Sequence, residues 1–184
     1  MSKGLIALIV VAVLGLSIFM GYRSMYNNAV TYQEKVTKAW ADVGADYQRR
    51  ADLIPQLVAT VKGAAENEKG ILTGVTNARA GISAATTPAQ LDAAGAKINM
   101  LIKATFEAYP TITSTANFSD LQAQLEGTEN RIGVSRKAYT DAIMVYNSHI
   151  RGFFSSMFLN ASIFPHKDPF KEAAGSEKAP EVKF

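Results

Sequence analysis

The sequence predicts an all-α protein, in which an N-terminal transmembrane helix is followed by an elongated, up-and-down four-helix bundle. Two observations support this. Residues 5–20 contain no charged side chain. The chain after them repeats apolar residues every three or four positions, which is the spacing of one face of an α-helix, and no comparable alternating run indicates a strand.

The apolar segment comes first. Counted from Gly4 to Tyr22, about 19 residues would span about 28 Å as a helix, close to the hydrocarbon thickness of a bilayer. A cleaved signal peptide is the rival interpretation, but the residues from Phe19 to Tyr22 contain no pair of small residues at the spacing of a cleavage site. We therefore expect residues 1–23 to form an uncleaved, single-pass membrane anchor.

Three helical stripes follow the anchor, each a series of mostly apolar residues spaced three or four apart and so on one face of a helix. They run from Val36 to Val75, from Leu91 to Ala108 and from Phe118 to Phe153. In the first stripe the steps average about 3.5 residues, which predicts left-handed, coiled-coil-like packing. A capping box at residues 87–90 (Thr-Pro-Ala-Gln) starts the second stripe, and the Tyr-Pro pair at residues 109–110 ends it.

Pro55 decides how the first stripe is divided. One unbroken helix from Arg23 to Ile82 would be about 90 Å long, whereas its partners would reach only about 30 and 50 Å. A break near residues 52–55 instead gives four helices of comparable length, which favours a break there and a bundle over residues 24–153, while the sequence alone leaves open whether the stripe is one helix or two. If the chain does not turn at this point, other copies must bury the exposed stripe.

Composition excludes several function classes. The formal charge of +3 is small and its cations are interspersed with acids, which argues against nucleic acid as a partner. The chain has no cysteine, and its two histidines, His149 and His166, have no recognisable carboxylate spacing beside them. Nucleophile and phosphate-binding motifs are missing as well. We therefore expect no catalytic residue, no metal and no cofactor.

Three stretches carry a resemblance to a known family: Gln48-Arg49-Arg50-Ala51-Asp52-Leu53-Ile54-Pro55-Gln56-Leu57-Val58, Thr60-Val61-Lys62-Gly63, and Leu125-Glu126-Gly127-Thr128-Glu129-Asn130-Arg131-Ile132. With Tyr26-Asn27, Ala39-Trp40, Tyr109-Pro110 and Tyr146-Asn147, they make residues 4–165 resemble the LemA family. The resemblance implies a bacterial inner-membrane protein, with one N-terminal membrane helix and a cytoplasmic four-helix bundle. It implies no reaction, and a member associated with magnetosome membranes suggests a part in organising membranes.

The longest motifs supply the candidate polar site. Its residues are Gln48, Arg49, Arg50, Asp52 and Pro55 from the first motif, and Glu126, Gly127, Thr128, Glu129, Asn130 and Arg131 from the last. The favoured interpretation is a structural network that fixes helix register through pairs between arginine and carboxylate groups. The alternative is a patch that binds an anion or a peptide.

Two further surfaces are candidates for contacts. Gly63, Gly70, Gly74 and Gly81 share one helical stripe, which indicates either a loosened helix or a smooth face for a helix of another subunit. The aromatic segment at residues 154–165 and its flank carry Phe153, Phe154, Met157, Phe158 and Phe164. These side chains either lie at the membrane interface or close the end of the bundle. Residues 166–184 read as a flexible tail.

Together these features predict a non-enzymatic, membrane-anchored scaffold or adaptor that self-associates and organises membrane or partner proteins. Its expected partners are the lipid bilayer, further copies of the chain and other membrane proteins. The excess of Arg23, Lys35 and Lys38 over Lys3 favours a cytoplasmic body. The alternative function is a module of the cell envelope that binds or senses a ligand through the region of Arg49 and Arg50.

Overall fold

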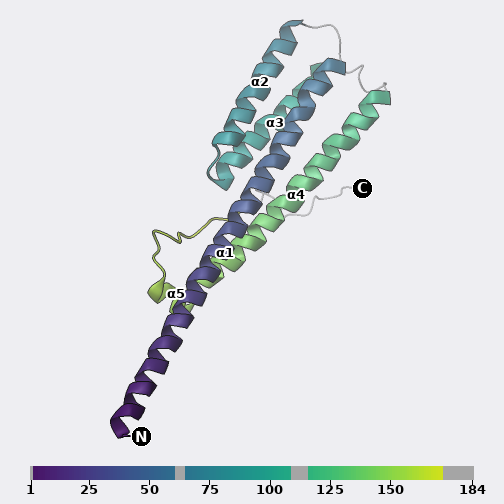
Figure 1. Cartoon of the computed structure of the whole chain (residues 1–184). Coiled ribbons are helices and arrows are strands. Elements are labelled where there is room, and N and C mark those ends of the chain that lie inside the picture. The colour runs from purple at the N-terminus through teal and green to yellow at the C-terminus, as the bar shows by residue number, and fades with distance from the viewer. Residues whose placement is uncertain (1, 61–64, 109–115, 172–184) are drawn as a thin grey trace, which may run out of the picture. The chain divides into compact units, whose positions relative to one another are not determined.

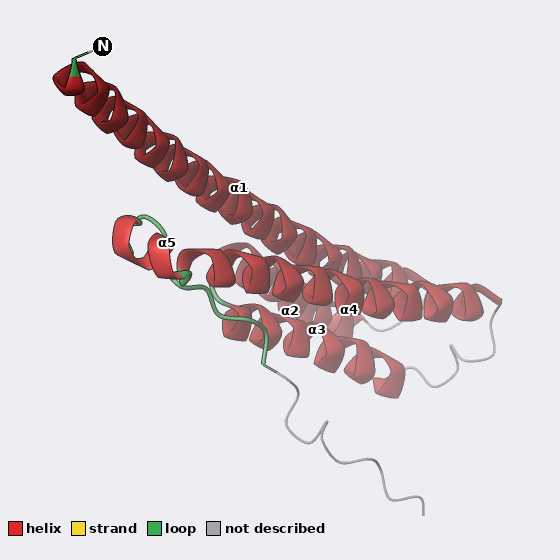
Figure 2. Cartoon of the chain, turned by 90° about the horizontal axis from the view of Figure 1, so that it is seen from below, coloured by secondary structure: helices red, strands yellow, loops and turns green. Residues whose placement is uncertain are grey.

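The computed structural model describes residues 2–60, 65–108 and 116–171, and these ranges contain helices and no strand. The helices are α1 (Lys3–Thr60), α2 (Ala65–Ala84), α3 (Pro88–Ala108), α4 (Ala116–Ile150) and the short α5 (Phe153–Phe158) (Figure 1). The predicted all-α class is confirmed, and the same elements stand out as red ribbons in Figure 2. The chain divides into two compact units. Unit 1 comprises Met1–Lys38 and Asp141–Lys167, and unit 2 comprises Ala39–Thr140 and Asp168–Phe184.

Helix α1 runs through Pro55, so the expected break between Asp52 and Pro55 is wrong. Proline inside a helix costs about 3 kcal/mol because it removes one hydrogen bond and crowds the preceding turn. Its neighbours explain why the helix continues, since Ile54 and Leu57 are almost completely buried. Each such side chain contributes about 1.5–3 kcal/mol on burial, so the pair offsets the cost of the proline. The link between α1 and α2 falls on residues 61–64, outside the described residues.

The core of unit 2 is built from segments of α1, α2, α3 and α4 that run side by side (Figure 1). Their buried side chains follow the periods read from the sequence: Val43, Tyr47, Ala51, Ile54 and Val58 from α1, Val75, Ala78 and Ile82 from α2, Leu91, Ala94, Ile98 and Ile102 from α3, and Leu121, Leu125, Ile132 and Tyr139 from α4. The buried hydroxyl groups of Thr105, Thr128 and Ser135 donate hydrogen bonds to backbone carbonyl groups of their own helices, and so their polarity is satisfied.

The predicted capping box starts α3. The Gln90 amide N–H donates to the Thr87 hydroxyl oxygen at 3.3 Å, and the Thr87 N–H donates back to the Gln90 side-chain oxygen at 3.2 Å. A further N–H, from Thr86, reaches the same oxygen at 2.9 Å. These bonds satisfy backbone donors that a helix start leaves without partners, which is why α3 begins at Pro88.

Unit 1 contains the apolar part of α1. Within the described residues, one helix passes a length and composition test for a membrane span: Lys3–Ala59 has an 18-residue window of mean hydropathy 2.6, and none of that window is buried. A soluble helix of this apolarity would be covered by its own protein. The N-terminal helix is therefore a candidate membrane anchor.

The end of α4 and the segment after α5 make up the rest of unit 1. The Tyr146 hydroxyl donates to the Pro165 carbonyl oxygen at 3.0 Å, and Asn147 exchanges two hydrogen bonds with the backbone of Lys167. His149 Nε2 lies 2.9 Å from the Met25 carbonyl oxygen of α1, and since a carbonyl only accepts, this nitrogen carries the proton. These bonds fix the chain on both sides of α5.

Candidate functional site

Arg50 joins the two longest sequence motifs. Its guanidinium Nε donates to the Asn99 side-chain oxygen at 3.0 Å, and Nη1 donates to the Leu125 carbonyl oxygen at 2.7 Å. The same Nη1 lies 3.3 Å from the Thr128 hydroxyl and 3.1 Å from a carboxylate oxygen of Glu129. The Arg50 side chain is only 12 % exposed, whereas that of Glu129 is 56 % exposed. One arginine of α1 is therefore bound to both α3 and α4.

The remaining motif residues from α1 have different partners. Asp52 pairs with Arg79 of α2 and not with the second motif, and the side-chain amide of Gln48 donates to the Ser83 hydroxyl at 3.0 Å. Arg49, the neighbour of Arg50, is exposed. The first motif thus connects α1 to α2, α3 and α4 through successive side chains.

The second motif contributes mainly Thr128 and Glu129 to the Arg50 cluster. Glu126 accepts a hydrogen bond from Gln122 at 3.2 Å on the surface of α4. Gly127 has open space where a Cβ would lie, and Asn130 and Arg131 are exposed beside a groove that Asp42 and Asp46 of α1 also line. The structure therefore brings together only part of the predicted polar site.

A second polar cluster, absent from the sequence prediction, connects Tyr47, Asp92 and Arg136. The Tyr47 hydroxyl lies 3.3 Å from one Asp92 oxygen, and Arg136 Nη1 lies 3.0 Å from the same oxygen. The Arg136 guanidinium is also 4.5 Å from the centroid of the Phe170 ring, a cation–π contact. Tyr47 appeared in the first stripe as an apolar position. The polar end of a core tyrosine needs a partner, and this was the available signal.

The environment of Tyr47 makes stability depend on pH. Burial, together with the nearby Asp92 carboxylate, raises its pKa to about 12, although the neighbouring Arg136 opposes the rise. A group with a raised folded-state pKa stabilises the protein fully below its unfolded pKa of about 10 and loses that contribution as pH rises to the folded value. We therefore expect the free energy of unfolding to fall between pH 10 and pH 12.

The measurement is chemical denaturation of the full chain across this pH range, with Tyr47→Phe as the control. Lysines titrate in the same range, so only the difference between the two proteins isolates Tyr47. The Tyr47→Phe variant is expected to show a shallower decline. Equal slopes would contradict a burial-raised pKa at this residue.

The predicted glycine stripe splits into positions with different environments. A Cβ at Gly74 would lie 2.7 Å from a methyl carbon of Leu101, and one at Gly81 would lie 3.5 Å from the Ala94 Cβ, so both face α3 of the same chain. Gly70 has nothing within 4 Å of such a Cβ. Gly63 lies outside the described residues.

Most of the predicted aromatic surface is exposed. Phe153, Phe154, Met157 and Phe158 are 75 %, 68 %, 65 % and 55 % exposed. Phe164 does not share this exposure, because it is buried and packs edge-on against Tyr26 with ring centroids 5.3 Å apart. It therefore belongs to the core of unit 1. Two residues of the predicted tail also have contacts: the Lys167 backbone is hydrogen-bonded to Asn147, and the Phe170 ring stacks on Trp40.

Charged groups in unit 2 are arranged to bind one another. A groove of about 530 Å³ beside Arg50 is lined by Ile102, Phe106 and Leu125, and by Glu126 and Glu129. Two carboxylates at its wall repel an anion that approaches Arg50. Within residues 2–60, 65–108 and 116–171, no group of three or more His, Asp or Glu side chains is placed to hold a metal ion.

The fold and the site define an all-helical protein with an apolar N-terminal helix and a helical body cross-linked by polar side chains. The model of the LemA family matches residues 39–184, well over half of the chain, and the chain belongs to the LemA family. The predicted resemblance is thus confirmed, with a match that begins within α1, after its apolar run. The family is not a known enzyme family. A comparison with curated proteins found no match.

Proposed function

We propose that this protein is a non-enzymatic scaffold that α1 anchors in a membrane and that self-associates to organise membrane or partner proteins. The carrying observation is the continuity of α1, which runs without interruption from a fully exposed apolar window into the helical body. The apolar segment and the first helix of the body are thus parts of one continuous helix, which would tie the body to the membrane without an intervening loop. We further propose that the body is an up-and-down four-helix bundle on the cytoplasmic side.

The polar clusters support a structural role. Arg50, Arg79 and Arg136 each bind a carboxylate of another helix in the same chain. Such pairs fix the register of helices, and they leave these three arginines already bound to carboxylates of the same chain. The ligand-sensing alternative relied on Arg49 and Arg50, and no observation favours it, because Arg50 is occupied and its groove is acidic.

Self-association has a candidate face on α2. Gly70, Thr73, Asn77, Ala80 and Ala84 are exposed at three- and four-residue spacing, so they share one face of the helix. They carry no charge and no large side chain, and Leu72 beside them is 42 % exposed. Small side chains let two helices approach closely, which is the packing we propose between copies.

The test is the mass of the full-length chain in native lipid particles, measured by mass photometry. We expect a defined oligomer for the unmodified protein and monomers for Gly70→Glu combined with Ala80→Glu, since like charges would then meet across the contact. Gly127→Glu is the matched control, because Gly127 on α4 is equally open. A monomeric unmodified protein would contradict self-association, and an oligomer that survives both α2 substitutions would contradict this face.

A further inference from the structure

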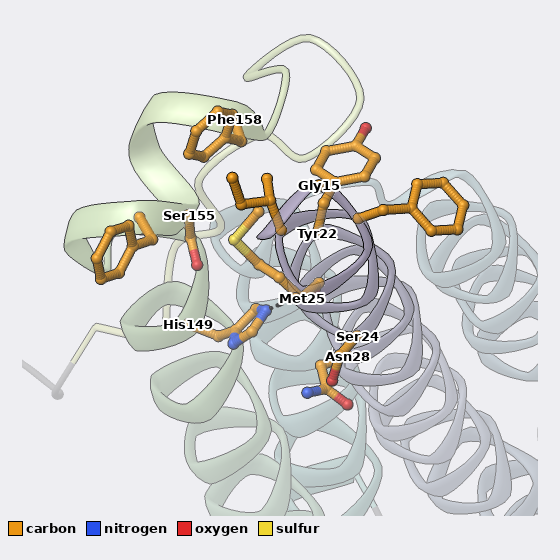
Figure 3. Close-up of a pocket in the computed structure, with 12 residues that line it drawn as sticks. Gly15, Tyr22, Ser24, Met25, Asn28, His149, Ser155 and Phe158 are labelled. Atoms are coloured by element: carbon orange, nitrogen blue, oxygen red, sulfur yellow. Dashed lines mark hydrogen bonds between the residues drawn. The ribbon is translucent and has the colours of Figure 1, made fainter. Parts of the chain in front are cut away.

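Unit 1 contains a groove of about 980 Å³ between α1 and α5. Its apolar wall comes mainly from Gly15, Ile18 and Phe19 of α1 and from Phe154 and Phe158 of α5. Figure 3 shows α5 beside α1, with Ser155 and His149 near Met25 and with Phe158 over the groove. The groove is thus apolar, with a few polar groups at one end.

The position of the groove along α1 indicates its surroundings. Its lining begins at Gly15, inside the apolar run, and continues to Ser24 and Asn28, beyond that run. At 1.5 Å per residue, this stretch is about 20 Å long. In a membrane-anchored chain the groove therefore crosses from the hydrocarbon region to the headgroups, where lipid is the abundant apolar molecule.

Helix α5 exposes its large apolar side chains although its ends are fixed. Phe164, the Tyr146 bond to Pro165 and the Asn147 pair with Lys167 hold the following segment against α4 and α1. The side chains of Phe153, Phe154, Met157 and Phe158 are nevertheless all more than half exposed. A short helix that exposes four large apolar side chains suits the interface of a bilayer and not water.

Charge selects the kind of lipid. In the two segments of unit 1, residues 1–38 and 141–167, six Lys or Arg stand against two Asp or Glu, so the positive charge of the chain arises there. Arg23 lines an adjoining groove together with Phe19, Ser24 and Asn28, which also line the first. Arg151 lies two residues before Phe153, where α5 begins. Cations placed beside an apolar groove attract an anionic headgroup.

We propose that the groove between α1 and α5 binds an acyl chain of an anionic glycerophospholipid, whose phosphate lies near Arg23 and Arg151. This inference rests on the membrane anchoring in the proposed function, and it adds a lipid site to it. The bound lipid would hold α5 in the interface and set the depth of α1.

Tryptophan reporters in lipid vesicles test the membrane anchor and the lipid groove separately. In a Trp40→Phe background, which removes the single native tryptophan, Phe158→Trp reports on the groove and Val11→Trp reports on the span. Val11 is exposed and does not line the groove. Phospholipids brominated on the acyl chain quench a tryptophan that touches them. We expect both reporters to be quenched, and the groove reporter more strongly when phosphatidylglycerol replaces part of the phosphatidylcholine.

Each outcome has one meaning. Quenching of the Val11→Trp reporter alone overturns the lipid groove and leaves the anchor standing, whereas no quenching at either position overturns the anchor itself. A groove reporter shielded from both brominated lipid and aqueous acrylamide would mean that protein, such as a second copy, fills the groove, which overturns the proposal. Equal quenching with and without phosphatidylglycerol overturns the anionic headgroup.

Substitutions that fill the groove give an independent measurement. Gly15 and Gly21 line it and have open space at the Cβ position, so Leu at either site fits without a clash. Each acyl methylene that such a side chain displaces is expected to lower lipid retention about fourfold. The readout is native mass spectrometry of the full chain with its co-purified phospholipid. Gly4→Leu, equally open but distant in the sequence, should retain wild-type lipid, and unchanged retention in all three variants would contradict the site.

Discussion

Arg50→Ala is expected to lower the free energy of unfolding by about 2 kcal/mol, because it removes a mostly buried guanidinium group and leaves its acceptors without a donor. The groups affected are the Leu125 carbonyl oxygen, the Asn99 side-chain oxygen and the Glu129 carboxylate. Glu129 and Asn99 are both exposed, so water compensates part of their loss, and most of the effect comes from the Leu125 carbonyl oxygen.

The adjacent arginine provides the control. Arg49 is exposed, and its replacement by Ala is expected to change stability by no more than about 0.5 kcal/mol, the usual range for surface positions. Arg50→Lys keeps the charge but loses the planar guanidinium group that reaches α3 and α4 together. Its loss of stability should therefore lie between those of Arg49→Ala and Arg50→Ala. The measurement is chemical denaturation of the full chain in detergent. Trp40 fluorescence reports on unit 2, where Trp40 packs against Tyr139.

This comparison also separates the two functions considered for the first motif. If Arg50 fixes the register of the helices, its loss destabilises the body and the loss of Arg49 does not. If the two arginines form a ligand site, both substitutions should leave stability nearly unchanged. Equal effects of Arg49→Ala and Arg50→Ala would therefore contradict the structural role that the contacts of Arg50 support.

The periodic part of the fold was predictable from sequence because burial repeats with the helix. Val43, Ile54 and Val75 lie in the first predicted stripe, and all three are buried. The capping box at Thr87 was predictable as well, since it involves neighbours in sequence. Both features depend on local spacing, which one sequence contains.

At Pro55 the local preference of proline against helix predicted a break that the structure does not have. Proline disfavours helix, and the argument from helix length placed a break there, but burial of Ile54 and Leu57 outweighs the local cost. The length comparison started at Arg23 and so treated the apolar segment and the first helix of the body as separate elements. In the structure one helix, α1, contains both, and a comparison of lengths cannot detect this.

The polar contacts were predictable only in part. Arg50 and Glu129 were both placed in the candidate polar network because they lie in recognisable motifs, whereas the pairing of Asp52 with Arg79 depends on the rotation of α2 against α1. The cluster of Tyr47, Asp92 and Arg136 joins three helices, and no motif marks Asp92 or Arg136. Such contacts follow from helix register, which the apolar period alone leaves undetermined.

Gly95→Ala is expected to destabilise the protein by about 3 kcal/mol, at the upper end of the cost of overpacking a core. A Cβ at this position would lie 2.2 Å from Cε1 of the Tyr47 ring, far inside contact distance. The ring has little room to move, because Tyr47 is 6 % exposed and its hydroxyl bonds Asp92. No predicted feature marked Gly95, yet among the glycines in the described part of the chain it would have the closest neighbour to a Cβ.

The same substitution at an open position should act in the opposite direction. Gly133 on α4 has nothing within 4 Å of the place where a Cβ would lie, so Gly133→Ala is expected to stabilise the helix by about 0.5–1 kcal/mol. Chemical denaturation followed by Trp40 fluorescence measures both variants. The difference in sign isolates the environment of Gly95 from the general preference of helices for alanine.

A double-mutant cycle identifies the ring as the cause. Tyr47→Leu removes the aromatic atoms that a Cβ at position 95 would strike, so Gly95→Ala should cost much less in that background than in the native one. An unchanged cost would locate the strain elsewhere and contradict the close approach of α1 and α3. A reduced cost would mean that Gly95 is required by the Tyr47 ring, and hence that the hydroxyl of that ring reaches Asp92 and Arg136 because α3 lacks a side chain at this point.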